Sequence, residues 1–385
     1  MKTFSSLGVS DAILDALAAG GVTHPFPVQA LTIPDALAGR DVCGKAKTGS
    51  GKTLAFGVPL LQRTPPGAAP RRPAALVLVP TRELAAQVHG VLEPLASAVG
   101  LRATVTYGGT PLARQLAALR SGADVLTATP GRLIDLVDSG QASLDDVVTV
   151  VVDEADRMAD MGFLPQVEWL LRRTPGRKQT MLFSATLDGD VGWLVKTYLA
   201  DPVMHEVISE EATVESMEHR FLAVHEMDKA KVAAAIVAGA NRTIIFCSTK
   251  RGADRAAREL AQLGTRVAAL HGDLRQEARE KSLAAFTAGR IPALVATDVA
   301  ARGIDVEGID VVVHYDPASD SKEYLHRSGR TARAGASGMA VSLLLWNQHV
   351  NAERICRQLG ISQPIVEVFS NDPRLSDLNA WDPAA

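Results

Sequence analysis

An early segment of the chain, AKTGSGKT at positions 46–53, has the residue types of a phosphate-binding loop. Its glycines allow successive backbone N–H groups to point at phosphate oxygens, and the helical pattern that follows adds the positive end of a helix dipole. In such a loop Lys52 reaches the β- and γ-phosphates and the hydroxyl of Thr53 holds Mg²⁺. Ala46 replaces the first glycine of the usual pattern, so an ordinary Gly/Ser turn before a lysine is the alternative.

The acidic pair Asp153 and Glu154 is a second group with the residue types for catalysis. The apolar run at 147–152 precedes it, which predicts that the pair ends a buried strand. A carboxylate there can hold Mg²⁺ through its water shell, and the neighbouring glutamate can orient or deprotonate a water molecule. A solubilising surface pair is the alternative, but the buried strand favours the metal-and-base interpretation.

Two further segments carry side chains that suit a nucleotide. The carboxamide of Gln29, one short helix before the loop, can both donate to and accept from an adenine edge, although a lone glutamine is usually a solvated surface residue. The run HRSGRTAR at 326–333 is rich in cationic side chains. A solvated helix face or an anion patch is the alternative there, but arginines supplied to an open phosphate site would stabilise transition-state charge.

The elements that must position these residues follow a repeating strand–helix pattern. In the first half, apolar runs alternate with helical segments; the runs are residues 75–79, 103–106, 124–128, 147–152 and 180–183. This pattern predicts a parallel sheet covered by helices on both faces. Ligands of such sheets bind at the carboxyl ends of the strands. Polar clusters follow all of these runs, and their shared edge favours one site over a set of ordinary turns.

The strand–helix pattern is interrupted once along the chain and then resumes. Residues 207–218 are acidic and lack periodicity, which predicts a flexible linker. We therefore expect an N-terminal domain at 1–206 and a C-terminal domain at 219–370 with the same architecture but no phosphate loop. A short, flexible tail is expected at 371–385.

The composition of the chain limits the class of protein that it can be. The chain has 385 residues, of which 47% are apolar and 22% charged, which is typical of a globular protein of two or three domains. No apolar run has membrane length and no signal-like segment is present, so a cytoplasmic location is expected. A net charge of −3 argues against a polybasic nucleic-acid coat but allows a local basic groove. The distant cysteines, Cys43, Cys247 and Cys356, indicate buried apolar positions and no disulfide or zinc site.

Taken together, the motifs resemble those of the DEAD-box ATP-dependent RNA helicases of superfamily 2. The resemblance covers residues 4 to about 345 in the family's order and spacing, with the box itself at 153–156. The matching segments are AKTGSGKT, PTREL, GG, TPGR, DEAD, SAT, HGDLRQEAR, ATDVAARGIDV and HRSGRTAR. The resemblance implies two RecA-like domains joined by a flexible linker, with ATP and Mg²⁺ bound and RNA as the partner.

The resemblance also implies roles for individual residues. The catalytic set would be Lys52, Asp153, Glu154, Arg330 and Arg333, with Glu154 as the base, the two arginines as fingers, and Mg²⁺ on Thr53 and Asp153. Nucleotide binding would involve Phe4, Gln29, Thr48, Gly49, Ser50, Gly51, Lys52, Thr53 and Asp305, with Asp305 at the ribose. Coupling of hydrolysis to strand separation would involve Asp156, Ser184, Thr186 and His326.

The family's RNA path would likewise draw on both halves of the chain. One half would be lined by Pro80, Thr81, Arg82, Gly108, Gly109, Thr129, Gly131 and Arg132, and the other by Gln276, Arg279, Thr297 and Arg302. Contacts to the sugar-phosphate backbone of RNA do not depend on the base sequence, so we expect RNA binding that is independent of sequence and sensitive to salt. Preference for RNA over DNA would rest on 2′-hydroxyl contacts. We expect a monomer that can also bind protein cofactors.

The sequence departs from the family at Val22, Phe26, Lys47 and Ala332. Val22 replaces an aromatic residue beside the adenine and removes a stacking face, and Phe26 stands where threonine is common. We expect a helicase that couples ATP binding and hydrolysis to local unwinding or remodelling of RNA duplexes or RNA–protein complexes. The alternatives are an ATP-dependent RNA clamp or scaffold without productive unwinding, a translocating DNA helicase or other two-domain ATPase, and a non-enzymatic RNA-binding module.

Overall fold

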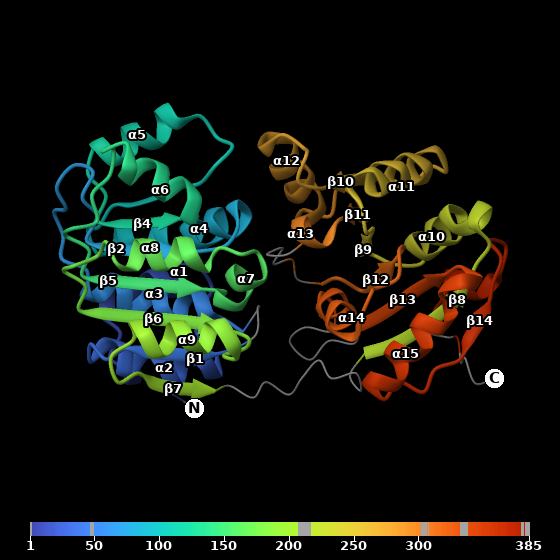
Figure 1. Cartoon of the computed structure of the whole chain (residues 1–385), viewed down its shortest axis with the longest axis horizontal. Coiled ribbons are helices and arrows are strands. Elements are labelled where there is room, and N and C mark those ends of the chain that lie inside the picture. The colour runs from blue at the N-terminus through green and yellow to red at the C-terminus, as the bar shows by residue number, and fades with distance from the viewer. Residues whose placement is uncertain are drawn as a thin grey trace. The chain divides into compact units, whose positions relative to one another are not determined.

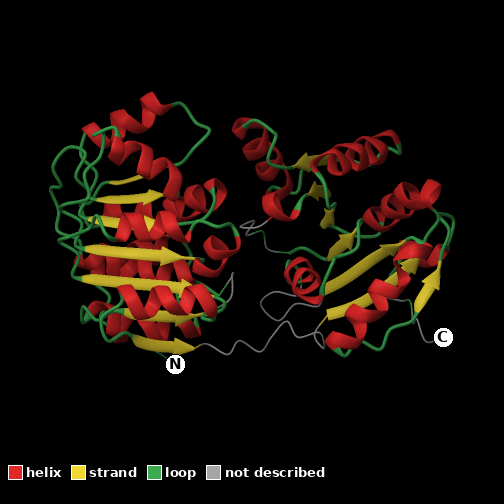
Figure 2. Cartoon of the chain, in the orientation of Figure 1, coloured by secondary structure: helices red, strands yellow, loops and turns green. Residues whose placement is uncertain are grey.

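The two strand–helix patterns fold into two parallel sheets, each flanked by helices (Figures 1 and 2). The computed structural model describes residues 2–46, 50–206, 217–301, 306, 308–331, 338–378 and 381. The chain divides into two compact units, Met1–Ser209 and Glu210–Ala385. The predicted α/β class is therefore confirmed. Most of the predicted linker, residues 207–216, lies outside the described residues.

The sheet of the first unit contains every apolar run predicted for it. In sheet order its strands are β3 (Ala103–Thr106), β4 (Val125–Ala128), β2 (Ala75–Leu78), β5 (Thr149–Asp153), β6 (Gln179–Ser184), β1 (Val42–Lys45) and β7 (Val203–Glu206). All the pairings are parallel, so the carboxyl ends of the strands lie along one edge. The edge strand β7 was not foreseen because it alternates in burial and carries a histidine and a glutamate.

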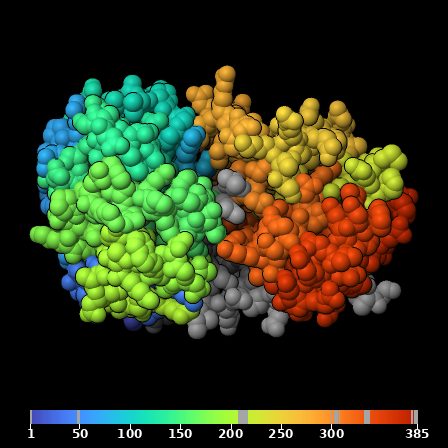
Figure 3. Space-filling view, in the orientation of Figure 1, coloured from blue at the N-terminus to red at the C-terminus, as the bar shows by residue number. Residues whose placement is uncertain are grey.

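Helices bury both faces of this sheet. Their bounds are η1 (Ser5–Leu7), α1 (Asp11–Ala19), α2 (Pro27–Leu37), α3 (Lys52–Arg63), α4 (Arg82–Ala98), α5 (Leu112–Arg120), α6 (Pro130–Asp138), α7 (Ala155–Asp160), α8 (Leu164–Leu171) and α9 (Gly189–Tyr198). Side chains alternate along a strand: Val77 of β2 packs with α1 to α4, whereas Leu76 and Leu78 pack with α6 to α9. Figure 3 shows α8 and α9, in green and yellow-green, covering the near face.

The second unit repeats this plan. Its strands in sheet order are β10 (Val267–Leu270), β11 (Ala293–Ala296), β9 (Thr243–Phe246), β12 (Val311–His314), β13 (Gly338–Leu344), β8 (Met217–Ala223) and β14 (Ile365–Glu367). Its helices are η3 (Glu226–Asp228), α10 (Lys229–Ala238), α11 (Lys250–Gln262), α12 (Gln276–Thr287), α13 (Asp298–Ala301), α14 (Ser321–Ser328), η4 (Trp346–Gln348), α15 (His349–Leu359) and η5 (Pro373–Ser376). Residues 217 and 218, which we had assigned to the linker, begin β8.

The end of the chain differs from the expected flexible tail. Leu375, Leu378 and Trp381 are buried in the apolar cluster that contains α10 and α11. Arg220 of β8, itself buried, donates hydrogen bonds to the carbonyls of Leu378 and Trp381 at 3.4 and 2.9 Å. Apolar side chains spaced along an irregular segment show no periodicity, so the sequence pattern does not reveal this packing.

No helix in the described part of the chain is long and apolar enough to cross a membrane.

Gly44 in β1 offers a test of how tightly the sheet of the first unit is packed. A Cβ added at Gly44 in β1 would lie 2.5 Å from Cε1 of Phe183 on the neighbouring strand β6. Gly44→Ala should therefore lower the free energy of unfolding by about 1–3 kcal/mol, because the core is already filled. The measurement is urea unfolding of the full chain followed by circular dichroism.

Gly90→Ala is the matched control for that substitution. Gly90 lies within α4, and an added Cβ there has no neighbour within 4 Å. Alanine should raise the free energy of unfolding by up to about 1 kcal/mol, because glycine is a poor helix former. Equal unfolding midpoints for Gly44→Ala and the wild type would contradict the tight packing of β1 on β6.

Candidate nucleotide-binding and hydrolysis site

The carboxyl edge of the first sheet gathers the predicted phosphate-binding and acidic residues. Lys45 at the end of β1 pairs in register with Ser184 of β6, and Asp153 at the end of β5 pairs with Phe183. The phosphate loop leaves the sheet beside these residues and leads into α3 at Lys52. The described part of the loop is Ala46 and residues 50–53, whereas Lys47, Thr48 and Gly49 lie outside the described residues.

Gly51 caps the amino end of α3. Its φ of 87° is in the left-handed region, which favours glycine. Its carbonyl oxygen accepts a hydrogen bond of 2.9 Å from Nε2 of Gln29. The first backbone N–H groups of α3 have no partner within the helix, which is the property that an anion-binding helix end requires.

Lys52 and Asp153 form the central ion pair of the site. Nζ of Lys52 lies 3.8 Å from Oδ1 of Asp153, and the two residues are 6% and 2% exposed. Burial raises the pKa of Asp153 to about 6, and the charge of Lys52 opposes that rise. The ionised carboxylate is therefore costly at this position, and a second cation beside it would lower that cost.

Asp153 and Thr53 offer oxygen atoms that suit a magnesium ion. Asp153 offers a buried carboxylate, and Thr53 offers a hydroxyl in the first turn of α3 directly after Lys52. Both are hard oxygen donors, which Mg²⁺ prefers, and it is usually bound by few protein ligands. Magnesium binding by Thr53 and Asp153 stays a prediction that these donors would allow.

Glu154 has a strained backbone and a buried ion pair. Its φ of 53° is left-handed, and it precedes α7 as that helix's N-cap residue. Its carboxylate accepts a 2.6 Å hydrogen bond from Nη1 of Arg157, and both residues are less than 9% exposed. Its N–H donates to Oδ1 of Asp153 at 2.9 Å. Such strain persists where the surroundings fix a functional geometry.

Asp156 connects the acidic segment to β6. Its N–H donates to Oγ of Ser184 at 3.1 Å, and its Oδ2 accepts from the N–H of Ala185 at 3.2 Å. The Ser184 hydroxyl in turn donates to the carbonyl of Thr186 at 2.6 Å. The structure therefore brings together three of the residues predicted to couple hydrolysis to strand separation, and Thr186 is exposed.

The predicted adenine site is joined to the phosphate loop through Gln29. Gln29 is 1% exposed, and its Oε1 accepts a 2.9 Å hydrogen bond from the N–H of Phe26. Phe4 is 3% exposed and packs in the apolar core. Its predicted part in nucleotide binding stays a prediction.

The first predicted RNA-binding group gathers at the carboxyl ends of β2, β3 and β4. The guanidinium of Arg82 lies against Gly108 and Gly109, where an added Cβ would collide with it at Gly109. Gln115 accepts from Arg132 at 3.5 Å and also bonds Thr106 and the carbonyl of Tyr107. Thr81 caps α4, Pro80 precedes it, and Thr129 and Gly131 flank the first residue of α6.

The predicted residues of the second unit are only partly described. Arg302, Asp305 and Arg333 lie outside the described residues. His326 is exposed near the end of α14, and Arg330 follows that helix. Thr297 directly precedes α13, while Gln276 and Arg279 lie in the first turn of α12, where Gln276 is buried and donates to Glu280 at 3.0 Å.

Arg327 is a structural residue that we had not assigned to any role. It is 1% exposed and donates to both carboxylate oxygens of Asp298, at 2.7 and 2.8 Å. It also donates to Glu323 and to the carbonyl of Asp316, each at 2.6 Å. One buried guanidinium therefore fixes α13 and α14 together, with the bidentate geometry that arginine favours.

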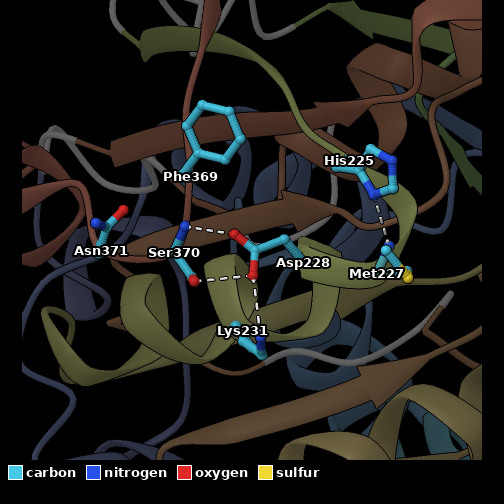
Figure 4. Close-up of a pocket in the computed structure, with 7 residues that line it drawn as sticks. All are labelled: His225, Met227, Asp228, Lys231, Phe369, Ser370 and Asn371. Carbon is cyan, nitrogen blue, oxygen red and sulfur yellow. Dashed lines mark hydrogen bonds and ion pairs between the residues drawn. The ribbon is translucent and has the colours of Figure 1, made fainter.

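A hollow of about 590 Å³ lies elsewhere in the second unit (Figure 4). Its lining is His225, Met227, Asp228, Lys231, Phe369, Ser370 and Asn371. The carboxylate of Asp228 is held by Ser370 and lies 3.4 Å from Nζ of Lys231. None of the residues predicted for catalysis or binding lines this hollow.

Three residues at the two sites escaped the sequence analysis. Gln115, Arg157 and Arg327 are buried polar side chains: Arg157 pairs with Glu154 of its own helix start, whereas Gln115 and Arg327 also bond residues of other elements. Arg157 follows the acidic segment directly, which is the one available signal. The partners of Gln115 and Arg327 depend on tertiary contacts that spacing does not encode.

Comparison with known proteins identifies the family of both units. A family model described as DEAD/DEAH box helicase matches residues 26–192, and one described as helicase conserved C-terminal domain matches 228–335. The chain is 40% identical over 361 residues to DEAD-box ATP-dependent RNA helicase 53 of Oryza sativa subsp. japonica. It is 40% identical over 377 residues to ATP-dependent RNA helicase RhlB of Xanthomonas axonopodis pv. citri. These matches cover 91% and 95% of the chain but 59% and 64% of the relatives' lengths.

Solved structures give the same result. S. cerevisiae Dbp5 bound to RNA and ADP BeF3 superposes with a TM-score of 0.82 at 29% identity, covering 97% of each chain. A DEAD box protein from the hyperthermophile Methanococcus jannaschii is 33% identical, with a TM-score of 0.53, covering 95% of this chain and 99% of that one. The predicted pair of RecA-like domains is thereby confirmed as a fold.

The Glu154–Arg157 pair generates a test of stability. Arg157→Met should lower the free energy of unfolding by roughly 3–5 kcal/mol, because it removes the ion pair of a buried carboxylate. Adding Glu154→Gln should recover most of that loss, since neither buried charge then remains. The measurement is urea unfolding of the two single variants and the double variant.

Arg172→Met is the control for that cycle. Arg172 pairs with Glu168 on α8, but its side chain is 68% exposed. Its loss should cost less than about 1 kcal/mol, because water screens exposed pairs. If the effects of Arg157→Met and Glu154→Gln simply add, the two side chains are not energetically coupled.

Proposed function

This chain belongs to the DEAD-box family of RNA helicases, and we propose that it couples ATP binding and hydrolysis to local unwinding or remodelling of RNA. The relatives named above are longer than this chain, so their activities come to it only as part of this proposal. The observation that carries the proposal is the buried cluster of Lys52, Asp153 and Glu154 beside the start of α3.

The first unit would hold the nucleotide. The phosphates lie at the amino end of α3 against Thr48, Gly49, Ser50, Gly51 and Lys52, and Gln29 reads the adenine edge. Asp305 of the second unit meets the ribose. Thr53 and Asp153 hold Mg²⁺, which neutralises charge on the phosphate oxygens when bound. The pairing of Lys52 with Asp153 fits these roles, because each side chain would gain an oppositely charged neighbour.

Hydrolysis would be carried by Glu154 and the arginines after α14. The Glu154 carboxylate accepts a proton from the attacking water, and Arg157 holds that carboxylate in place. Arg330 and Arg333 stabilise the charge that develops on the transferred phosphoryl group. The anchoring of α14 by Arg327 supports this role, because a fixed helix end limits how far the following arginines can move.

RNA would be bound along its backbone. The supporting observation is the cluster of Arg82, Gly108, Gly109 and Arg132 around Gln115, which combines guanidinium groups with exposed turns. The second unit contributes Gln276, Arg279, Thr297 and Arg302. In its solved structure, S. cerevisiae Dbp5 is bound to RNA and ADP BeF3. Asp156, Ser184 and Thr186, with His326, would couple hydrolysis to movement of the bound strand.

We also place the protein in the cytoplasm as a monomer that can bind protein cofactors, as the sequence led us to expect. Size-exclusion chromatography with light scattering tests the monomer, and tagged expression followed by fractionation tests the location.

The decisive experiment compares nucleic acids as activators. ATP hydrolysis by the full chain should rise with single-stranded or duplex RNA and respond much less to DNA of the same sequence. A labelled RNA duplex should be displaced when ATP is present. Stimulation without displacement would indicate an RNA clamp, and equal stimulation by DNA would contradict the RNA assignment.

Glu154→Gln is the active-site variant for this assay. It should still bind ATP and RNA while kcat falls by roughly 10²–10⁴, because a positioned general base contributes that much. Equilibrium binding and steady-state hydrolysis measure the two effects separately. If Glu154→Gln loses binding instead, the residue has a structural role and is not the base.

Arg330→Ala tests the arginine fingers. With saturating RNA and ATP, kcat should fall roughly 10³-fold or more, and Arg333→Ala should behave alike, because each finger stabilises transition-state charge. Arg258→Ala, an exposed arginine on α11 whose guanidinium bonds a carbonyl of its own helix, is the matched control and should retain kcat. Unchanged hydrolysis in Arg330→Ala and Arg333→Ala would refute a shared catalytic site.

A further inference from the structure

Phe26 is an exposed aromatic side chain at the predicted nucleotide site. It directly precedes α2, in extended conformation between Pro25 and Pro27. The residue is 54% exposed, which is unusual for phenylalanine. A single exposed apolar residue needs no functional explanation, so its contacts must decide whether it has one.

Phe26 is connected to the phosphate loop both by its backbone, through Gln29, and by its ring. Its N–H donates to Oε1 of Gln29, and Nε2 of Gln29 donates to the carbonyl of Gly51, each at 2.9 Å. A Cβ added at Gly51 would lie 2.5 Å from Cδ2 of the Phe26 ring, so the ring lies against this glycine. The ring is therefore fixed beside the start of α3 while much of it remains open to solvent.

Other aromatic rings near this site are not available to a ligand. Phe4, Phe56 and Phe183 are each 3% exposed or less and pack in the apolar core. Val22, which precedes Phe26 in the same connection, has no ring. A nucleotide whose phosphates lie at Gly51 and Lys52 would find an aromatic face at Phe26.

Gln29 retains hydrogen-bonding capacity beside that ring. A carboxamide has two N–H donors and an oxygen with two lone pairs, and the two bonds above use one of each. A purine edge that both donates and accepts hydrogen bonds could use the remaining donor and acceptor of Gln29. Any base can stack on an aromatic ring, whereas the Gln29 amide can distinguish bases by the hydrogen-bonding groups on their edges.

We propose that the ring of Phe26 is the stacking face for the base of the bound nucleotide and so sets affinity at this site. The inference rests on the proposed function, because it requires a nucleotide on the phosphate loop. Phe26 would then provide the aromatic face that Val22 lacks. Gln29 then supplies selectivity for the edge of the base.

The test compares ligands with and without a base. Phe26→Leu keeps an apolar side chain but removes the aromatic face, and should raise the Kd for ADP about tenfold, as expected from the strength of base–aromatic stacking. The Kd for pyrophosphate, which has no base, should stay within about twofold. Phe26→Tyr, which keeps an aromatic face, should bind ADP like the wild type.

Phe369→Leu is the matched control. Phe369 is 56% exposed, close to the 54% of Phe26, and it lines the hollow in the second unit (Figure 4), whereas the phosphate loop belongs to the first unit. Its replacement should leave the Kd for ADP unchanged. Thermal unfolding of every variant identifies any loss of fold.

The outcomes separate the inference from the proposed function. If Phe26→Leu binds ADP like the wild type, or loses ADP and pyrophosphate affinity equally, the ring has no stacking role and only supports the turn at Gly51. If the wild-type chain binds neither ADP nor pyrophosphate, the proposed function itself fails. Weaker binding of ADP alone, restored in Phe26→Tyr, establishes the stacking face.

Discussion

The buried pair of Lys52 and Asp153 is the constraint on which the site of the first unit depends. Burying either charge alone would be costly, and their separation of 3.8 Å recovers only part of that cost. The pair forms because α3 starts directly after the loop from β1, while β5 ends one ladder step from the same edge. Phosphate oxygens beside Lys52 and a divalent cation beside Asp153 would each supply an opposite charge. The arrangement is therefore more favourable with a nucleotide than without one, which gives binding a physical driving force.

The second unit uses the same sheet for a different purpose. Where the first unit buries a lysine against an aspartate, the second buries Arg327 against Asp298, Glu323 and a carbonyl. Its five donors are largely satisfied by protein, so this cation holds elements together and does not await a phosphate. α13 leads into the segment that contains Asp305, and α14 leads into the segment that contains Arg333. One buried guanidinium therefore fixes the two helices that precede these segments.

Glu154 adds backbone strain at the same edge of the sheet. Glu154 has a left-handed φ of 53°, an unfavourable conformation for a side chain that is neither glycine nor asparagine. Gly44 and Gly51 each leave no room for a Cβ because Phe183, Phe26 and Gln29 approach so closely. The left-handed φ of Glu154 costs stability, whereas the close packing of Phe183 on Gly44 is part of the apolar core. The strain at Glu154 is consistent with a site whose geometry is selected for chemistry, at some expense to the free energy of folding.

The sequence by itself determined the fold class, the phosphate loop, the acidic pair and the family, because these depend on local order: apolar runs of strand length, glycines beside Lys52, and two acids after a buried strand. It could not determine what long-range packing decides. Phe4 and Phe26 are both phenylalanines near the loop, and only the folded chain shows that one is in the core and the other is exposed against Gly51. The packed tail at Trp381 and the pairing of Arg327 with Asp298 have the same origin. Burial and pairing belong to residues that are distant in sequence, and spacing along the chain contains no record of which distant residues meet.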